Sequence, residues 1–156
     1  MRLQLCAVGR IRKGPERALL EDYLTRFDRA GKQLFLGPCS EHEIDDRKAT
    51  SAGAQGEALL RAVPSGAVLL ALDERGQQMT SPEFAAWLAR ARDRGISDLA
   101  IVIGGADGLA EQVVARADQQ LSLGGMVWPH RLARVMIAEQ LYRAATILAG
   151  SPYHRT

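Results

Sequence analysis

The chain has 156 residues, with 20 Lys and Arg against 18 Asp and Glu, and its net charge is +2. A composition of 47% apolar and 24% charged residues is that of a folded globular protein and excludes wholesale disorder. The length fits one compact domain over residues 1–156. No apolar run approaches the ~18 residues that a membrane span needs, so we expect no membrane partner. Two cysteines are too few for a disulfide scaffold or a four-ligand zinc site, and we expect no metal.

The first half of the chain alternates strand and helix patterns. Residues 3–8 are a short apolar run that predicts a buried strand. Basic residues follow it at once, the opposite order to a secretory signal, so we expect a cytoplasmic protein. Apolar spacing predicts a helix over residues 15–30, residues 33–36 are a short strand candidate, and residues 45–62 are expected to be helical. Four acidic residues are then expected on a solvated loop and helix start, with a metal or phosphate-repelling role as the less favoured alternative: Glu41, Glu43, Asp45 and Asp46.

The second half contains the strongest local signals. Residues 67–72 and 99–103 are continuous apolar runs, as central parallel strands should be. Between them, Thr80 and Glu83 form the pattern of a capping box, which predicts a helix that reaches Arg94 and stops at Gly95. A helix over residues 109–118, an apolar stretch at 121–128 and a long helix at 130–149 complete the chain. The alternation predicts an α/β protein whose mostly parallel sheet is flanked by helices.

Three turns follow predicted strands, at residues 72–76, 104–108 and 123–128. Ligands of open α/β sheets bind at the carboxyl ends of strands, and glycine lets the backbone approach them closely. The glycines of residues 104–108 have neither the Rossmann spacing nor a Walker lysine. By itself this turn is equally well explained as a tight connection between strand and helix.

The C-terminal third carries the remaining candidates. The helix at 130–149 is apolar on most faces, which favours a second subunit as its cover. Glu139 and Arg143 are spaced as an intrahelical ion pair, a plain surface salt bridge being the alternative. The tail places Tyr153, His154 and Arg155 in a row, and such side chains stack on bases and pair with phosphates.

At these residues the sequence resembles a known family. The segments VIGGADGL at residues 102–109, LSLGGMVWPHRLARVMIAEQLYRA at 121–144 and SPYHR at 151–155 are similar to the large-subunit ribosomal RNA pseudouridine N3-methyltransferases, the RlmH type of the SPOUT superfamily. MRLQLCAVGRI at the N-terminus and LLALDERG followed by TSPEFA also match in order and position. The resemblance covers nearly the whole chain.

The resemblance implies a SPOUT-type fold with a C-terminal trefoil knot and S-adenosyl-L-methionine as cofactor. The matching cofactor positions, acting mostly through backbone groups, are Leu72, Gly105, Leu123, Gly124, Gly125, Met126, Val127 and Trp128. The chain departs from the family at three places. Gly124 and Gly125 replace a hydroxyl residue and alanine, and Val127 replaces threonine; a site formed by backbone groups tolerates these changes, but a side-chain hydrogen bond there would be lost. Ala106-Asp107 replaces Pro-Glu, which keeps the acidic position and reduces the rigidity of the turn.

The resemblance also implies a homodimer in which the tail completes the partner's active site. The implied substrate is a pseudouridine in a stem-loop of the 23S rRNA within the assembled 70S ribosome. His154 is the first candidate to accept the N3 proton and Glu139 the second. Arg143 and Arg155 are expected to stabilise charge or hold phosphates, and Tyr153 to stack on the base. His130 and Arg134 are expected on the RNA side, with packing as the alternative for His130.

Two rival interpretations remain at this stage. One is a catalytically silent ribosome-binding factor that retains the fold, and it predicts no cofactor binding. The other is a small nucleotide-binding module, which predicts a phosphorylated ligand at residues 104–108.

Overall fold

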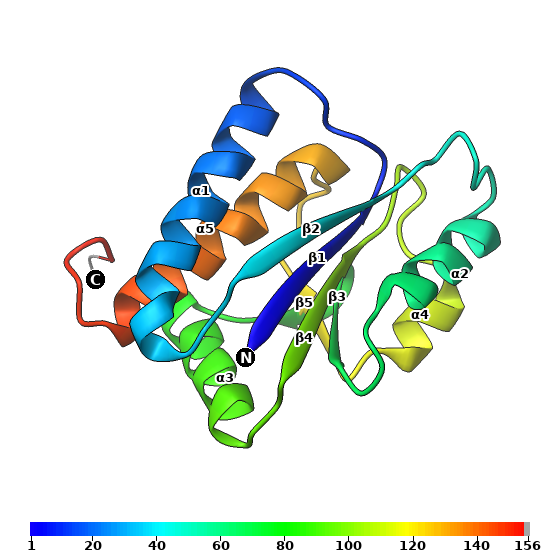
Figure 1. The fold of residues 1–156 in the computed structure, drawn as a ribbon. Coiled ribbons are helices and arrows are strands. Elements are labelled where there is room, and N and C mark those ends of the chain that lie inside the picture. Colours follow the sequence, from blue (N-terminus) through cyan, green and yellow to red (C-terminus); the bar gives the residue numbers. More distant parts are fainter. Residues whose placement is uncertain (155–156) are drawn as a thin grey trace.

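A single parallel sheet organises the molecule. The computed structural model describes residues 1–154 and places five strands in the order β2-β1-β4-β3-β5, with every neighbouring pair parallel (Figure 1). The strands are β1 (Arg2–Val8), β2 (Cys39–Ile44), β3 (Val68–Gln78), β4 (Asp98–Ile103) and β5 (Gln119–Ser122). The apolar runs predicted as central strands are β1, β3 and β4, and they occupy the middle of the sheet, where both faces are covered.

Helices cover both faces, which confirms the predicted α/β class. They are α1 (Pro15–Gly31), α2 (Ala52–Ala62), α3 (Ser81–Asp93), α4 (Glu111–Arg116) and α5 (His130–Leu148), with a short 3₁₀ turn, η1, at Lys32–Leu34. In Figure 1, α1, α3 and α5 lie on one face and α2 and α4 on the other. Over the described residues, no helix combines the length and apolar character that crossing a membrane requires.

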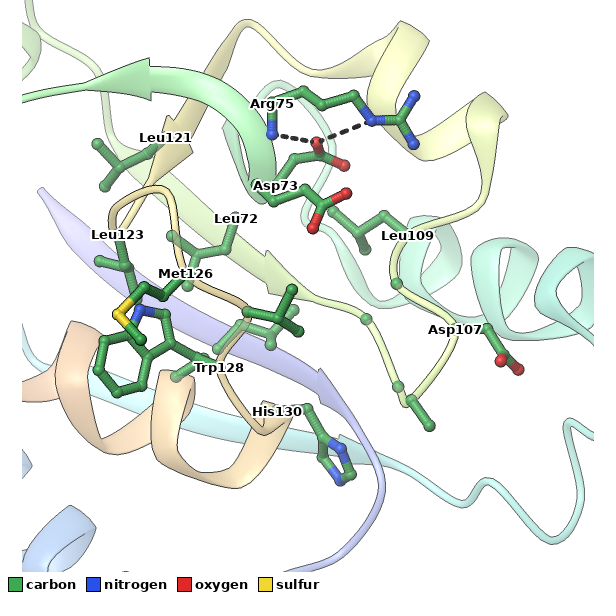
Figure 2. A pocket seen from close by; sticks show the side chains of 18 of the residues that line it. Leu72, Asp73, Arg75, Asp107, Leu109, Leu121, Leu123, Met126, Trp128 and His130 are labelled. Atoms are coloured by element: carbon green, nitrogen blue, oxygen red, sulfur yellow. Dashed lines mark hydrogen bonds and ion pairs between the residues drawn. The ribbon is translucent and has the colours of Figure 1, made fainter.

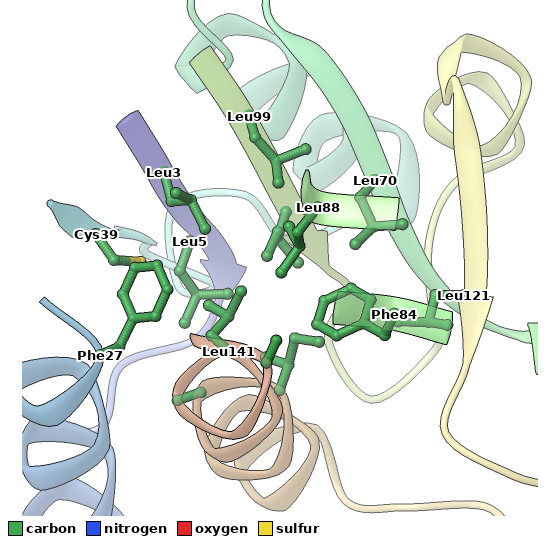
Figure 3. Packing of buried hydrophobic residues seen from close by; sticks show 14 of the residues in the cluster. Leu3, Leu5, Phe27, Cys39, Leu70, Phe84, Leu88, Leu99, Leu121 and Leu141 are labelled. Carbon is green, nitrogen blue, oxygen red and sulfur yellow. The ribbon is translucent and has the colours of Figure 1, made fainter. Parts of the chain in front are cut away.

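The core is divided by the sheet into two layers because successive strand residues point to opposite faces. Leu3 and Leu5 of β1 pack with Phe84 and Leu88 of α3 and with Leu141 of α5 (Figure 3). Cys6 and Val8 of the same strand point into the other layer, beneath α2 and α4. One face of α5 is fully buried within its own subunit, so the long helix is anchored before any partner is considered; its residues are Ile137, Ala138, Leu141, Ala144 and Ala145.

The capping box predicted at the start of α3 is confirmed. Thr80 Oγ1 accepts the backbone N–H of Glu83, and the Glu83 carboxylate accepts the backbone N–H of Thr80 at 2.7 Å. Two of the amide groups that a helix start leaves without intrahelical partners are thereby satisfied.

Most predictions between residues 33 and 51 were wrong, although Asp45 and Asp46 do lie in the loop after β2, as expected. The strand candidate at residues 33–36 is partly the 3₁₀ turn η1, and the second strand, β2, begins at Cys39 instead. Glu41 and Glu43 lie on this strand rather than on a solvated loop, because two arginines neutralise them there. The following helix, α2, begins only after its N-cap Ser51.

Candidate functional site

The clearest cavity lies at the carboxyl ends of β3, β4 and β5. Its volume is about 340 Å³. Three segments surround it, residues 72–75 within β3, residues 103–109 after β4 and residues 121–128 from the end of β5 onward, and the first turn of α5 closes one side (Figure 2). The turns that the sequence indicated at residues 104–108 and 123–128 are confirmed, and they meet at one edge because parallel strands end together. The turn predicted at residues 72–76 is wrong, because these residues continue β3, whose pairing with β5 shifts register between Leu72 and Gln77.

The glycine turn after β4 is built for close backbone approach. A methyl group on Gly104 would lie 2.2 Å from the carbonyl oxygen of Gly108, so only glycine fits. Gly108 has a φ of +79°, and its N–H donates to the carbonyl of Gly105 at 3.1 Å. This hydrogen bond closes the turn, and residues 104–108 line the cavity.

Residues 123–128 form an apolar wall opposite this turn. Ser122 Oγ accepts the N–H of Gly124 at 3.2 Å and donates to its carbonyl at 3.1 Å, which turns the chain away from β5. Met126 is 74% exposed and Val127 is 83% exposed. Large apolar side chains exposed together beside a cavity mark a surface that a ligand or another subunit covers.

The polar groups of the cavity are mainly acidic. Asp73, Glu74 and Asp107 line the cavity together with the cation Arg75. Asp73 accepts the backbone N–H of Arg75 at 2.9 Å and pairs with its guanidinium at 3.9 Å (Figure 2). His130 lines the opposite side, and burial together with the nearby cations of Arg134 and Arg131 lowers the pKa of its imidazole. The cavity thus offers apolar surface for a flat ring and carboxylates for a positively charged ligand.

The structure gathers nearly all predicted cofactor positions here. Seven line this cavity: Leu72, Gly105, Leu123, Gly124, Met126, Val127 and Trp128. Gly125 is not among the lining residues, although both of its neighbours are. Sequence reasoning marked residues 72–76 but did not single out Asp73 or Glu74, and it named Asp107 only as an acidic position within the glycine turn. Their position after a continuous apolar run was the available signal.

A second group of predicted residues gathers around α5, away from this cavity. Glu139 Oε1 accepts two hydrogen bonds from Arg143, at 2.6 and 3.0 Å, and one from the hydroxyl of Tyr153 at 3.0 Å. Gln140 donates to the other oxygen of Glu139 at 2.7 Å. The Glu139–Arg143 pair is thus the centre of a network that holds the tail, which is more than a surface salt bridge.

Aromatic contacts fix Tyr153 in this network. Its ring centroid lies 4.7 Å from that of Tyr142, and the Arg143 guanidinium lies 5.0 Å from the Tyr153 ring. Burial, and then the hydrogen bond to the Glu139 carboxylate, raises the pKa of Tyr153 to about 12. Tyr153 therefore remains a protonated donor at neutral pH and cannot serve as the base.

The last candidates stand at the end of the described chain. His154 is half-buried, and its Nδ1 has no hydrogen-bond partner among the residues that the structure describes. Arg155, predicted as a catalytic residue, lies outside the described residues.

A second hollow joins the two regions. It has a volume of about 590 Å³ and shares Leu121, Leu123 and Gly124 with the first cavity. From there it runs between α1, α3 and α5 to Glu139 and Gln140. The apolar wall therefore has one cavity on each side, and Glu139 faces only the second.

Arg134 does not lie where an RNA contact requires it. Its side chain is 1% exposed, and its donors are directed to Glu41, Glu43 and backbone carbonyls inside the protein. The expectation that Arg134 touches RNA is wrong for this conformation, because the guanidinium is buried in an internal ion network. His130, one turn earlier, does reach the cavity.

Comparisons with known proteins agree with this arrangement. Residues 1–154 match the family model described as "Predicted SPOUT methyltransferase". Proteins named "Ribosomal RNA large subunit methyltransferase H" are 61% identical in Dinoroseobacter shibae, 59% in Ruegeria pomeroyi and 62% in Cereibacter sphaeroides. Each match spans 155 residues and covers 99% of both chains. The chain therefore belongs to the SPOUT methyltransferase family, among relatives of the large-subunit ribosomal RNA methyltransferase H type.

Proposed function

We propose that this protein transfers a methyl group from S-adenosyl-L-methionine to N3 of a pseudouridine in 23S rRNA. The observation that carries the proposal is the gathering of seven predicted cofactor positions around one cavity at the carboxyl edge of the sheet. The names of the full-length relatives support an RNA of the large ribosomal subunit as substrate. The pseudouridine target, the 70S context, a cytoplasmic location and the knotted C-terminal third follow from the family resemblance.

The cavity fits this cofactor in size and chemistry. Its volume of about 340 Å³ lies within the roughly 300–1,000 Å³ of small-molecule sites. The apolar wall with Trp128 suits an adenine ring, and the backbone of the Gly105 turn lies within reach of it. The carboxylates of Asp73, Glu74 and Asp107 suit the positive charges of the sulfonium and amino groups. When bound, the cofactor supplies a methyl group that is open to attack on the side opposite its sulfur.

The protein's own groups would position the base and remove its proton. N3 of pseudouridine carries a weakly acidic proton that must leave as the new N–C bond forms and the C–S bond breaks. We assign the role of proton acceptor to His154, because the oxygens of Glu139 are already occupied by four hydrogen bonds. Arg143 and Arg155 would stabilise the developing negative charge, and Tyr153 would stack on the base.

These groups would reach the cavity of a second subunit rather than their own. Glu139 follows His130 by nine residues, so the two stand about 14 Å apart along the helix axis. The tail packs beside Glu139 and Tyr142, whereas the cavity borders the first turn of the same helix. A homodimer that places the tail of one subunit over the wall of the other joins both halves of the site. It also covers the exposed side chains of Met126 and Val127.

The proposal is tested by transfer of a labelled methyl group into 70S ribosomes that lack the modification. Mass spectrometry of the released nucleosides should identify a methylpseudouridine. Equal transfer to a naked RNA transcript would refute the requirement for the ribosome. No transfer and no binding of S-adenosylhomocysteine by calorimetry would instead support a silent ribosome-binding factor, and binding of ATP or NAD would support a nucleotide-binding module.

A further inference from the structure

We propose that Arg134 is a positioning residue that fixes the start of α5, and through it His130 and the apolar wall, at the edge of the cofactor cavity. Its role in holding the wall rests on the geometry of the protein alone. Its effect on ligand affinity rests in addition on the proposed function.

Arg134 ties α5 to the carboxyl end of β1. Its Nη2 donates to the carbonyl oxygens of Val8 and Gly9, at 3.1 and 2.9 Å. Its Nη1 donates to Glu43 at 2.7 Å and to Glu41 at 3.0 Å, both on β2. One planar guanidinium thus connects α5 with two strands through Nη1 and Nη2, while its buried Nε has no hydrogen-bond partner among the described residues.

The surrounding charges keep this guanidinium in place. Arg17 of α1 donates to Glu41 at 2.6 Å and to Glu43 at 3.1 Å, so two cations face two carboxylates. Glu43 also accepts the backbone N–H of Ile11 at 2.8 Å, and Arg17 donates to the Ile11 carbonyl at 2.6 Å. Burying charge is costly unless it is paired in good geometry. Rotating Arg134 away would leave both carboxylates and two carbonyls short of donors.

His130 also packs against this end of β1, at Gly9. A methyl group on Gly9 would lie 3.4 Å from Nε2 of His130, so the imidazole packs on the residue whose carbonyl Arg134 holds. His130 and Ala133 line the cavity, and Arg134 is the next residue along the helix. The first turn of α5 is therefore fixed to β1 both by the His130 ring and by the Arg134 fork.

The position of the apolar wall depends on the Arg134 contacts because residues 123–128 form neither helix nor strand. Residues 123–129 connect the end of β5 at Ser122 with the start of α5 at His130. The sheet holds the first end, and the Arg134 network holds the second. Loosening the second end would let Met126, Val127 and Trp128 move together relative to the glycine turn.

The test compares Arg134→Met with Arg17→Met, which removes the other cation from the same two carboxylates without touching the cavity. Both variants are made in a Trp87→Phe background, so that Trp128 is the single tryptophan and reports on the wall. Measurements are made at a temperature at which circular dichroism shows both variants fully folded. The readouts are the emission maximum of Trp128 and the affinity for S-adenosylhomocysteine by calorimetry.

We expect Arg134→Met to weaken S-adenosylhomocysteine by about tenfold and to shift the Trp128 emission, since a loosened supporting shell spoils site geometry. Arg17→Met should lower Tm and change the affinity and the emission much less than Arg134→Met does, because Arg134 keeps its bonds to both carboxylates and to the carbonyls of Val8 and Gly9. Arg134→Lys keeps the charge without the fork and should fall between wild type and Arg134→Met, and it replaces that variant if the latter does not fold.

Unchanged emission and affinity in Arg134→Met would overturn the proposal, as would equal losses in Arg17→Met. If the wild-type protein itself binds no S-adenosylhomocysteine, the proposed function fails. The Trp128 emission still decides whether Arg134 fixes the wall.

Discussion

The cavity and the tail cluster consist of different types of residue. The cavity consists of glycine turns, an apolar wall and a few carboxylates, all placed where parallel strands end. The tail cluster, made by Glu139, Arg143 and Tyr153 with Tyr142, consists of ionic and aromatic side chains along the middle of one helix. We propose that the first binds the cofactor and that the second holds the reacting groups. Within one subunit Glu139 does not line the cavity, and the second hollow lies between the two regions. The difference indicates that binding and chemistry can be impaired separately, which four changes test.

Deleting residues 152–156 should have the largest effect. Transfer to the ribosome should fall below detection because Tyr153, His154 and Arg155 are lost together. Binding of S-adenosylhomocysteine should stay within about twofold, since residues 152–154, the part of the deleted segment that the structure describes, do not line the cavity. Parallel assays of methyl incorporation and calorimetry check both halves, and full activity of the truncated chain would remove the tail from the site.

Gly104→Ala should weaken binding of the cofactor, the step that the tail deletion leaves intact. Its methyl group would meet the Gly108 carbonyl at 2.2 Å, so the turn must open and displace the backbone of Gly105. We expect affinity for S-adenosylhomocysteine to fall by about a hundredfold, as site geometry changes on the ångström scale. The matched control is Gly53→Ala on α2, where a methyl group meets nothing within 4 Å, and its affinity should be that of wild type. Wild-type affinity in Gly104→Ala would show that the turn is not part of the binding site.

Glu139→Gln should impair transfer without impairing binding. The neutral amide keeps the size of the side chain but loses the charge that holds Arg143 and the Tyr153 hydroxyl. Hydrogen bonds to charged groups contribute about 1.5–3 kcal/mol, so we expect kcat to fall by roughly ten- to a hundredfold. The matched control is Glu57→Gln on α2, whose exposed carboxylate pairs with Arg61, and its kcat should be that of wild type. An unchanged kcat in Glu139→Gln would show that the network does not orient the tail.

The pH dependence of stability gives the smallest effect and concerns the edge of the cavity. The pKa of His130 is lowered in the folded protein, so below the ordinary histidine pKa of about 6.5 the unfolded chain binds more protons than the folded one. The His130 contribution to stability is therefore complete above that pH and decreases as the pH falls through it. Thermal unfolding at pH 7.5 and 5.5 should show a smaller loss of Tm in His130→Gln than in wild type. Equal losses would place His130 in a solvated environment.

The sequence predicted the cavity better than the ion network, for a physical reason. Strand runs, the capping box at Thr80 and glycine turns are local patterns, and the carboxyl ends of parallel strands meet wherever the sheet forms. Glu41 and Glu43 are paired instead with Arg134, more than ninety residues away, and no local pattern announces such a pair. Without knowledge of its distant cations, an acidic segment such as residues 39–44 is predicted as a solvated loop rather than as a strand. For the same reason Arg134, whose carboxylate partners are distant in sequence, is predicted to contact RNA. The tail was singled out by its side-chain chemistry, but its return to Glu139 depends on a tertiary contact.

The most direct test of the account is complementation between two inactive variants. The chain lacking residues 152–156 keeps the cavity, and Gly104→Ala keeps the tail. Coexpressed with different affinity tags and purified through both, they give a heterodimer with one intact cavity facing one intact tail. If the two regions act across subunits, this heterodimer should recover about half of the wild-type transfer per dimer, because one of two equivalent sites is complete. No recovery, with both chains folded and paired, would contradict the account and place cavity and tail in the same subunit.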